Sequence, residues 1–327
     1  MSRYQPPFQL NHTMMSRVAD IAEWLGRWKQ ANHEELVPQL RRGNRIRTIQ
    51  ASLAIEQNTL SLEQVTAVLD GKVVIGLPRE IQEVHNAFVA YEAMPGWNPA
   101  SLDDLLTAHG LLLKGLTGDA GQLRQGGVGI YQDKQLVHMA PPANQLPRLM
   151  DELLGWLAKA DAHPLIASSA VHYELEFIHP FSDGNGRIGR LWQTLMLSCW
   201  QPMLAFLPVE TAIKQRQADY YRVLGASDRA SDCSGFIVFM LDAILEALKE
   251  AVASETRVET LVKTRVKTPE RVLAVLRKDR FLSLADVADR LGLSVSAVER
   301  AAGKLRQEGR LRYVGPKKGG HWEVMEG

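Results

Sequence analysis

Apolar residues recur at spacings of three and four along most of the first two-thirds of the chain. Within residues 14–31, for example, Ile21, Leu25 and Trp28 share one side of the helical repeat, which is typical of an amphipathic helix. Further helix starts, each marked by a serine or a proline, are expected at Ser61, Pro78, Ser101 and Pro147. This part of the chain is therefore predicted to be mainly helical.

One segment, between residues 121 and 142, breaks the helical pattern. Two strand-like runs, 128–131 and 136–139, flank the polar turn 132–134, and a glycine pair at 126–127 precedes the first run. Short apolar runs on either side of a polar turn are typical of a β-hairpin. We expect a hairpin here; an ordinary surface hairpin is the alternative, which its place in the order of elements disfavours.

The last 60 residues show a second pattern. A charged stretch ends at Thr268-Pro269, which favours a helix that begins with a cap and a proline. A helix from Ser283, the turn Gly292-Leu293 and a helix from Ser294 then form a helix-turn-helix pattern. Two strand-like runs, 311–314 and 321–324, add a wing. The pattern predicts a small winged helix-turn-helix domain.

Composition limits the classes of protein. The 327 residues are 46% apolar, enough for a sizeable core, and the net charge of +1 argues against strong overall attraction to nucleic acid or to an anionic membrane. The only cysteines, Cys199 and Cys233, form no zinc or disulfide pattern. The first ten residues lack a signal-peptide core, and two acidic residues interrupt the longest apolar stretch, 236–248. These features predict a cytoplasmic protein without a membrane partner.

The densest chemistry lies in the run HPFSDGNGRIGR at 179–190. Gly184 and Gly186 flank Asn185, and such glycines let successive backbone N–H groups point into one concavity at a helix N-terminus, where they can bind an anion. Asp183 adds a hard oxygen ligand of the kind that Mg²⁺ prefers when phosphates complete its shell. The run is therefore predicted to bind Mg²⁺ and a polyphosphate.

Three more side chains of this run carry charge or can move a proton. Arg187 and Arg190 are three residues apart and can reach different phosphates as forked donors. His179 offers the near-neutral pKa that histidine brings to general-base catalysis. Each of these residues alone would more simply be packed or solvated, but that interpretation does not explain their concentration within twelve residues.

The same run resembles the signature of the Fic family, HPFx[D/E]GNGRxxR, at every specified position. The resemblance implies a mainly α-helical core and a protein adenylyltransferase, which moves AMP from Mg-ATP to a Ser, Thr or Tyr hydroxyl of a protein, itself or another. Relatives with similar signatures use other nucleotide donors. The implied roles are general base for His179, Mg²⁺ ligand for Asp183, α- and β-phosphate binding for Gly184, Asn185, Gly186 and Arg187, and γ-phosphate binding for Arg190.

Two further segments resemble parts of that family. The hairpin is similar to the family's flap, whose edge strand pairs with the backbone of the target; here that strand would be Val128, Gly129 and Ile130. Tyr220 and Tyr221 correspond to an aromatic pair beside the adenine. Simple core packing explains one of these two tyrosines equally well.

Ser52 and Glu56 are four residues apart, so they share one face of a predicted helix. The segment resembles the family's inhibitory motif [S/T]xxxE[G/N], which implies that Glu56 pairs with Arg190 and blocks the γ-phosphate. Gln57 departs from the motif, because Gly or Asn there would favour a left-handed helix exit. A solvated surface glutamate is the simpler alternative. In some relatives the same Glu also positions a water that removes AMP.

The resemblance implies a helical Fic core with a β-hairpin flap, followed by the winged helix. The expected organisation is an N-terminal helical region with the inhibitory helix at 1–100, the catalytic core at 101–248, a linker helix at 249–268 and the winged-helix domain at 269–327.

The winged helix leaves its partner open. Residues 268–327 hold twelve Lys and Arg against eight Asp and Glu, a modest excess for DNA binding. Arg300, Lys304 and the pair Lys317-Lys318 could meet phosphates, but Glu299 lies among them. Protein contacts or homodimer packing are equally good interpretations.

Two other functions remain as alternatives. One is a winged-helix transcription regulator whose Fic core senses the nucleotide or modifies only itself. The other is a metal-dependent hydrolase built on His172, Glu176, His179 and Asp183. It is weaker, since the four-residue spacing of His172 and Glu176 more simply indicates an exposed helix face.

Overall fold

The computed structural model describes residues 4–32, 37–132, 135–265, 268–316 and 319–325. The chain divides into two compact units, Met1–Val252 and Ala253–Gly327. The segments 1–100 and 101–248, which the sequence separates, pack together within the first unit.

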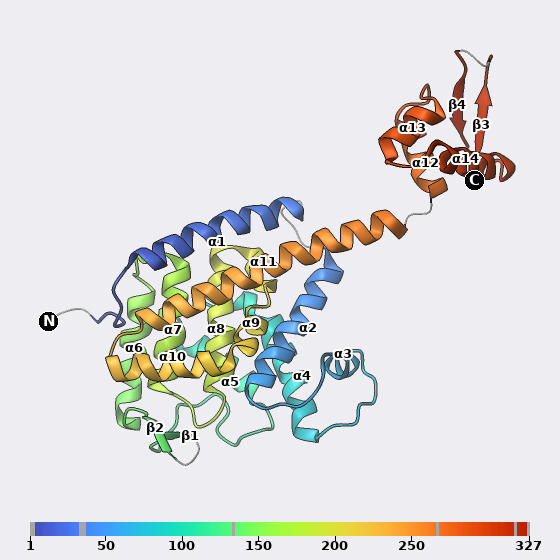
Figure 1. The fold of residues 1–327 in the computed structure, drawn as a ribbon. Helices are drawn as coiled ribbons and strands as arrows, with labels where there is room; N and C mark the ends of the chain where they lie inside the picture. Colours follow the sequence, from blue (N-terminus) through green and yellow to red (C-terminus); the bar gives the residue numbers. More distant parts are fainter. Residues whose placement is uncertain (1–3, 33–36, 133–134, 266–267, 317–318, 326–327) are drawn as a thin grey trace. The chain divides into compact units, whose positions relative to one another are not determined.

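The first unit is a helical bundle with one hairpin (Figure 1), as predicted from the helical pattern. Its helices are α1 (His12–Ala31), α2 (Pro38–Ile55), α3 (Leu62–Leu69), α4 (Pro78–Ala93), α5 (Leu102–Leu112), α6 (Leu146–Leu157), α7 (Pro164–Ile178), α8 (Asn185–Trp200), α9 (Val209–Gln215), α10 (Gln217–Ala230) and most of α11 (Ser234–Arg265). Short 3₁₀ helices lie at Met94–Gly96, Ala143–Gln145 and Pro202–Phe206.

Local sequence sets several helix starts. Ser61 caps α3 in a full capping box, in which its hydroxyl accepts from the Gln64 backbone while the Gln64 side chain accepts from the Ser61 N–H. Ser101 caps α5 in the simpler form. Pro78 occupies the first position of α4, where no intrahelical N–H is needed. The expected starts at these residues are confirmed.

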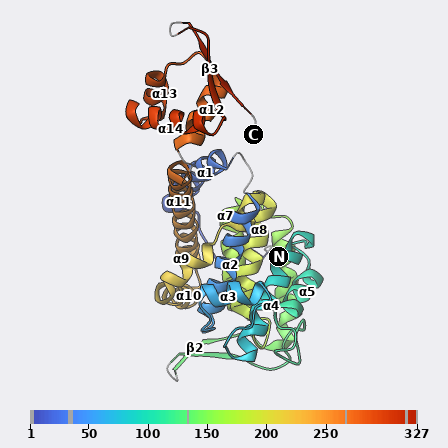
Figure 2. The same ribbon diagram turned by 90° about the vertical axis from the view of Figure 1, so that its right-hand side faces the viewer.

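α7 and α8 pack against one another at the centre of the unit (Figures 1 and 2). Successive residues of α7 belong to two different apolar clusters: Leu165 and Ala170 to one, Val171 and Leu175 to the other. Because both sides of α7 are covered, 13 of its residues are buried. The short loop between α7 and α8 is thus held at the end of a rigid helix pair.

The predicted hairpin is present as β1 (Gly129–Gln132) and β2 (Gln135–Met139), an antiparallel pair. The register is irregular between Ile130 and Tyr131. The Ala140 N–H donates to the Val128 carbonyl at 3.1 Å and closes the base. Residues 133–134 of the predicted turn lie outside the described residues.

α11 is longer than the sequence pattern indicated. It is one 32-residue helix, so the charged stretch from residue 249 to residue 265 continues the last helix of the bundle. Its acidic and basic residues interrupt the apolar character. No helix in the described ranges has the length and apolar content needed to cross a bilayer.

The second unit contains the predicted helix-turn-helix and wing: α12 (Thr268–Lys278), α13 (Leu284–Leu291), α14 (Val295–Gln307), β3 (Leu311–Val314) and β4 (His321–Val324). Ser283 and Asp286 form a capping box at α13, and Gly292 ends that helix with a left-handed φ of 63°. The wing strands are antiparallel. The Lys317-Lys318 pair at the predicted wing tip lies outside the described residues.

Candidate active site

His179 stands at the exact end of α7, in a backbone conformation that non-glycine residues rarely adopt. Its φ and ψ are 49° and 60°, which is left-handed, and its N–H still donates to the Leu175 carbonyl at 3.0 Å. Such a conformation costs energy and persists only where neighbouring contacts hold it. It turns the chain sharply out of α7 and into the loop.

The loop is closed by an amide side chain. The Asn185 side chain accepts from the Phe181 N–H at 3.0 Å and donates to the Phe181 carbonyl at 2.8 Å. Asn185 is 3% exposed, and Phe181 is fully buried. The predicted nucleotide ligand Asn185 therefore uses its side chain to shape the loop, which leaves anion binding to the backbone N–H groups at the start of α8.

His109 of α5 holds the same loop through a ring contact and a hydrogen bond. Its ring stacks on that of Phe181, with centroids 3.7 Å apart and planes 6° apart. The Gly121 N–H donates to His109 Nδ1, so Nε2 carries the proton and donates to the Asp183 carbonyl at 2.9 Å. Burial lowers the pKa of His109, which favours this neutral form.

Gly184 is required where the loop enters α8. Its φ is 84°, and a Cβ there would lie 2.5 Å from Leu113 Cδ2. Its N–H donates to Asp183 Oδ1 at 2.6 Å. The turn therefore needs a glycine for both its conformation and its close approach to α5.

Asp183 lies at the mouth of the loop beside two guanidinium groups. Its Oδ1 accepts from Arg187 Nη2 at 2.8 Å, and its Oδ2 accepts from Arg79 Nη2 at 3.1 Å. The side chain is 39% exposed. A hard carboxylate oxygen that remains accessible beside an anion-binding helix start fits an Mg²⁺ ion held mainly by nucleotide phosphates. Among the described residues, no group of three or more His, Cys, Asp and Glu could hold a metal ion.

Arg187 is held between two carboxylates. Besides Asp183, its Nη1 contacts Glu83 Oε1 at 3.3 Å. Glu83 in turn accepts a hydrogen bond of 2.8 Å from the Nδ2 of Asn58, and Asn58 follows Glu56 by two residues. Sequence reasoning missed Glu83 and Arg79. The i,i+4 spacing of these two residues on α4 was the available signal, and it does not indicate what lies opposite.

Arg190 and the end of α2 form the predicted ion pair. Arg190 is 2% exposed; its Nη2 donates to Glu56 Oε1 at 2.7 Å and its Nε to Ser52 Oγ at 3.0 Å. The Ser52 carbonyl accepts a further bond from Nη2 at 3.0 Å. Burial opposes the charge of Arg190, but Glu56, together with Tyr220 and Glu176, outweighs burial and raises the pKa of Arg190. Ser52 and Glu56 thus share one face, as their spacing predicted.

The Glu56 carboxylate also covers the first turn of α8. A Cβ on Gly186 would lie 2.3 Å from Glu56 Oε1 and 3.0 Å from Arg190 Nη1. Any side chain at this position would therefore displace the carboxylate. The start of α8 carries unpaired N–H groups and a partial positive charge, so the site that would attract a phosphate lies beside a protein carboxylate.

The left-handed exit after Glu56 forms despite the missing Gly or Asn. Gln57 has a φ of 69°, its N–H donates to the Ala54 carbonyl, and the Asn58 N–H donates to the Leu53 carbonyl. These bonds are those of a Schellman motif. The departure from the motif thus leaves the geometry of the helix end unchanged.

The two predicted adenine-side tyrosines differ in access. Tyr220 is 1% exposed, packs among aromatic rings and donates from its hydroxyl to Glu176 Oε1 at 3.1 Å. Tyr221 is 42% exposed. Only Tyr221 therefore offers a ring face that a base could reach, whereas Tyr220 fits the core-packing alternative.

The expected exposed face at His172 and Glu176 is wrong. His172 is fully buried and Glu176 is 8% exposed. His172 contacts Gln193 and Tyr220 through its two ring nitrogens. Burial alone would raise the pKa of Glu176, but His172, together with the charges of Arg190 and His179, holds this pKa below its ordinary value. Both nitrogens of His172 are thus taken, which removes the basis of the metal-hydrolase alternative.

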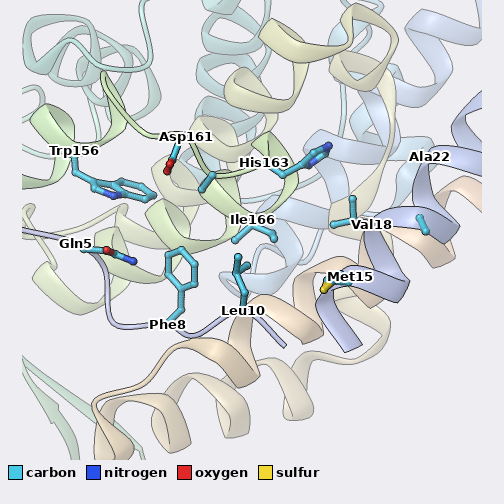
Figure 3. Close-up of a pocket in the computed structure, with 12 residues that line it drawn as sticks. Gln5, Phe8, Leu10, Met15, Val18, Ala22, Trp156, Asp161, His163 and Ile166 are labelled. Atoms are coloured by element: carbon cyan, nitrogen blue, oxygen red, sulfur yellow. The ribbon is translucent and has the colours of Figure 1, made fainter. Parts of the chain in front are cut away.

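An open pocket of about 590 Å³ lies away from the loop, between the N-terminal segment, α1 and the α6–α7 region. Figure 3 shows Phe8, Leu10 and Trp156 around it. No residue of 179–190 lines it, and its lining is mainly apolar. We assign it no role in the chemistry of the loop.

Comparison with known proteins identifies the family. The Fic/DOC family profile matches residues 99–197, and a profile described as winged helix-turn-helix DNA-binding matches residues 266–312. A Fic family protein from Desulfovibrio desulfuricans G20 has a solved structure that is 47% identical in sequence, with 98% of each chain covered and a TM-score of 0.76.

Curated relatives include the proteins named protein adenylyltransferase Fic from Culex quinquefasciatus and Aedes aegypti, which are 31% and 30% identical over 205 and 210 residues. Each alignment covers 60% of this chain but only 39% or 40% of the relative, so the chain spans about two fifths of the length of these proteins. The bacterial structure, by contrast, matches nearly end to end. On that match, together with the loop that joins α7 to α8, the chain belongs to the Fic family.

Proposed function

We propose that this protein is an adenylyltransferase that moves AMP from Mg-ATP to a hydroxyl group of a protein. The ion pair between Glu56 and Arg190 supports this proposal most directly, because it puts a protein carboxylate where the resemblance places the γ-phosphate. The names of the curated relatives support the same reaction. Substrate, donor and location in the cytoplasm belong to the proposal.

His179 begins the reaction by taking the proton of the target hydroxyl. The hydroxyl oxygen attacks the α-phosphorus of ATP, the bond from that phosphorus to the bridging oxygen breaks, and pyrophosphate leaves. The backbone N–H groups at the start of α8, Arg187 and Arg190 hold the phosphates in line and offset their charge. Asp183 would hold Mg²⁺, which supplies charge neutralisation on the phosphates.

The resting protein is autoinhibited in this proposal. Glu56 occupies Arg190 and covers Gly186, so a nucleotide must displace the carboxylate before its phosphates can align. Once displaced, the same carboxylate could hold a water for removal of AMP from a modified protein. Forward transfer is the direction that we test.

The target would add to the hairpin as a strand. A two-stranded sheet leaves the outer edge of β1 without a neighbouring strand among the described residues. Val128, Gly129 and Ile130 would pair with the backbone of the target and present its hydroxyl to His179. Such recognition depends little on target side chains, so it also permits self-modification.

The position of a radiolabel in ATP tests the reaction. The Glu56→Gly variant is incubated with Mg²⁺, cell lysate and ATP labelled at either the α- or the γ-phosphate. Kinases of the lysate transfer γ label by themselves, so each signal is read as the excess over a Glu56→Gly protein that also carries His179→Ala. This excess should come only from the α position. An excess of γ label alone would show phosphoryl transfer by this protein instead and would overturn the proposal.

The second unit supports a separate candidate activity, DNA binding. Arg300 and Lys304 are exposed on α14, and the matching family profile carries a DNA-binding description. A Lys304–Glu308 contact of 3.8 Å and the nearby Glu299 reduce the net positive charge of this surface. Binding to mixed-sequence duplex DNA should weaken with salt and with Arg300→Ala. No binding at low salt would leave protein contacts or a homodimer, which sedimentation would measure.

A further inference from the structure

Arg124, in the segment between α5 and β1, makes four side-chain hydrogen bonds to backbone carbonyls. Its Nε donates to the His179 carbonyl at 2.7 Å, and its Nη1 donates to the Gly126 carbonyl at 2.7 Å. Its Nη2 donates to the carbonyls of Pro141 at 2.6 Å and Ile178 at 3.3 Å. Arg124 is 4% exposed. The buried guanidinium of Arg124 thus uses nearly all of its N–H donors to hold backbone carbonyl groups in place.

The acceptors belong to two functional parts of the protein. Gly126 and Pro141 lie just before and just after the hairpin, whose base is closed by the Ala140–Val128 bond. Ile178 and His179 end α7. The side chain of one residue therefore joins both ends of the hairpin to the residue proposed as the general base.

The contacts with α7 also explain how the strained conformation of His179 is held. The last carbonyls of a helix lack intrahelical partners and carry partial negative charge, so a cation stabilises them. Arg124 meets two of these carbonyls with its side chain, and its own N–H donates to the Pro180 carbonyl at 3.0 Å. The three consecutive residues 178–180 thus all bond to Arg124.

We propose that Arg124 is a positioning residue that sets the hairpin and His179 in one fixed relation, so that a hydroxyl docked on β1 arrives at the base. This rests on the proposed transfer reaction. The hydrogen bonds that Arg124 makes within the described ranges go to residues 126, 141 and 178–180, and not to the residues assigned to the phosphates, Mg²⁺ or inhibition. Replacing Arg124 should therefore leave nucleotide binding unchanged and impair both the binding of the target and the transfer of AMP to it.

The test compares Arg124→Ala and Arg124→Lys in the Glu56→Gly background. Lysine keeps the charge but has one nitrogen, which cannot reach carbonyls on both segments as a planar fork does. Arg148→Ala is the matched control, because Arg148 is an exposed residue paired with Glu152 on α6. Both Arg124 variants should bind Mg-ATP like their parent, show a higher KM for the target and transfer AMP roughly 10²-fold more slowly, the cost of small misplacement at a reacting centre.

Chemical rescue separates positioning from general damage. Millimolar guanidinium should restore part of the transfer by Arg124→Ala, since the ion can replace the lost fork, and it should do nothing for His179→Ala. Guanidinium is the cation of a common denaturant, so a variant whose only defect is lower stability would recover no transfer activity in its presence. Absence of rescue together with an unchanged KM for the target would overturn the proposal.

Amide hydrogen exchange tests the coupling without any reaction. In Arg124→Lys, exchange should speed up both at Ala140 in the hairpin base and at Phe181 in the loop, while Ile188 in α8 keeps its protection. Unchanged exchange at either of the first two sites would overturn the coupling. If the Glu56→Gly parent transfers no AMP, the proposed function fails, and the exchange measurement still decides whether Arg124 joins the two segments.

Discussion

Replacing Glu56 by glycine removes the carboxylate from Arg190, and we expect transfer of AMP to rise. The Glu56–Arg190 bond is charged, 2.7 Å long and closed to solvent on the arginine side, although the glutamate side chain is 33% exposed. Hydrogen bonds to charged groups contribute about 1.5–3 kcal/mol. A nucleotide must break the Glu56–Arg190 bond in the wild-type protein, so removing this bond should raise the apparent affinity for the nucleotide roughly 10- to 10²-fold.

The assay measures the initial rate of AMP transfer against ATP concentration at equal folded protein. Glu56→Gln keeps the size of the side chain above Gly186 without its charge, so it should show a smaller gain. Gln57→Gly is the control for a new glycine, because it leaves the carboxylate in place and should leave transfer low. Adding Arg190→Ala to Glu56→Gly should cancel the gain, since the freed arginine is what holds the triphosphate. Equal or lower transfer by Glu56→Gly would refute the inhibitory role of α2.

Three further predictions concern the metal ligand, a helix end and a buried acid. Asp183→Ala should weaken ATP binding in the presence of Mg²⁺ much more than in its absence, as calorimetry with and without the ion would show. Gln57→Gly should stabilise the first unit by about 1 kcal/mol, because a left-handed φ costs a non-glycine residue about that much, and its melting temperature should rise. Burial raises the pKa of Glu174, which accepts a hydrogen bond from Tyr4, from 4.5 to about 7. The folded state therefore holds an extra proton between these values, and stability falls as pH rises through this window, by up to about 3 kcal/mol. Glu174→Gln should remove that fall from the melting temperature measured against pH; an identical pH dependence in both proteins would show that Glu174 does not cause it.

Local chemistry made much of the fold predictable. Ser61, Ser101 and Ser283 cap helices as expected, because a cap is decided within a few residues. The contact between Glu56 and Arg190 joins distant segments, and it was predictable only through resemblance to a family. Spacing alone placed Glu56 on a helix face without showing what lay opposite.

Contacts to the backbone explain what the sequence did not reveal. Arg124 and His109 act on carbonyl groups, which every residue has, so no pattern of side chains points to their partners. His172 and Glu176 were expected at an exposed face because polar residues at helical spacing usually lie there. Their burial depends on partners from α8 and α10, Gln193 and Tyr220, that satisfy them.

Mass spectrometry of the Glu56→Gly protein, incubated with Mg-ATP and cell lysate, tests the central claim most directly. The account predicts peptides, from the protein itself or from a target, that carry AMP on a hydroxyl side chain. These adducts should be scarce with the wild-type protein and absent when His179→Ala is added. Glu56→Gly samples without any AMP adduct, although the variant binds Mg-ATP, would contradict the account.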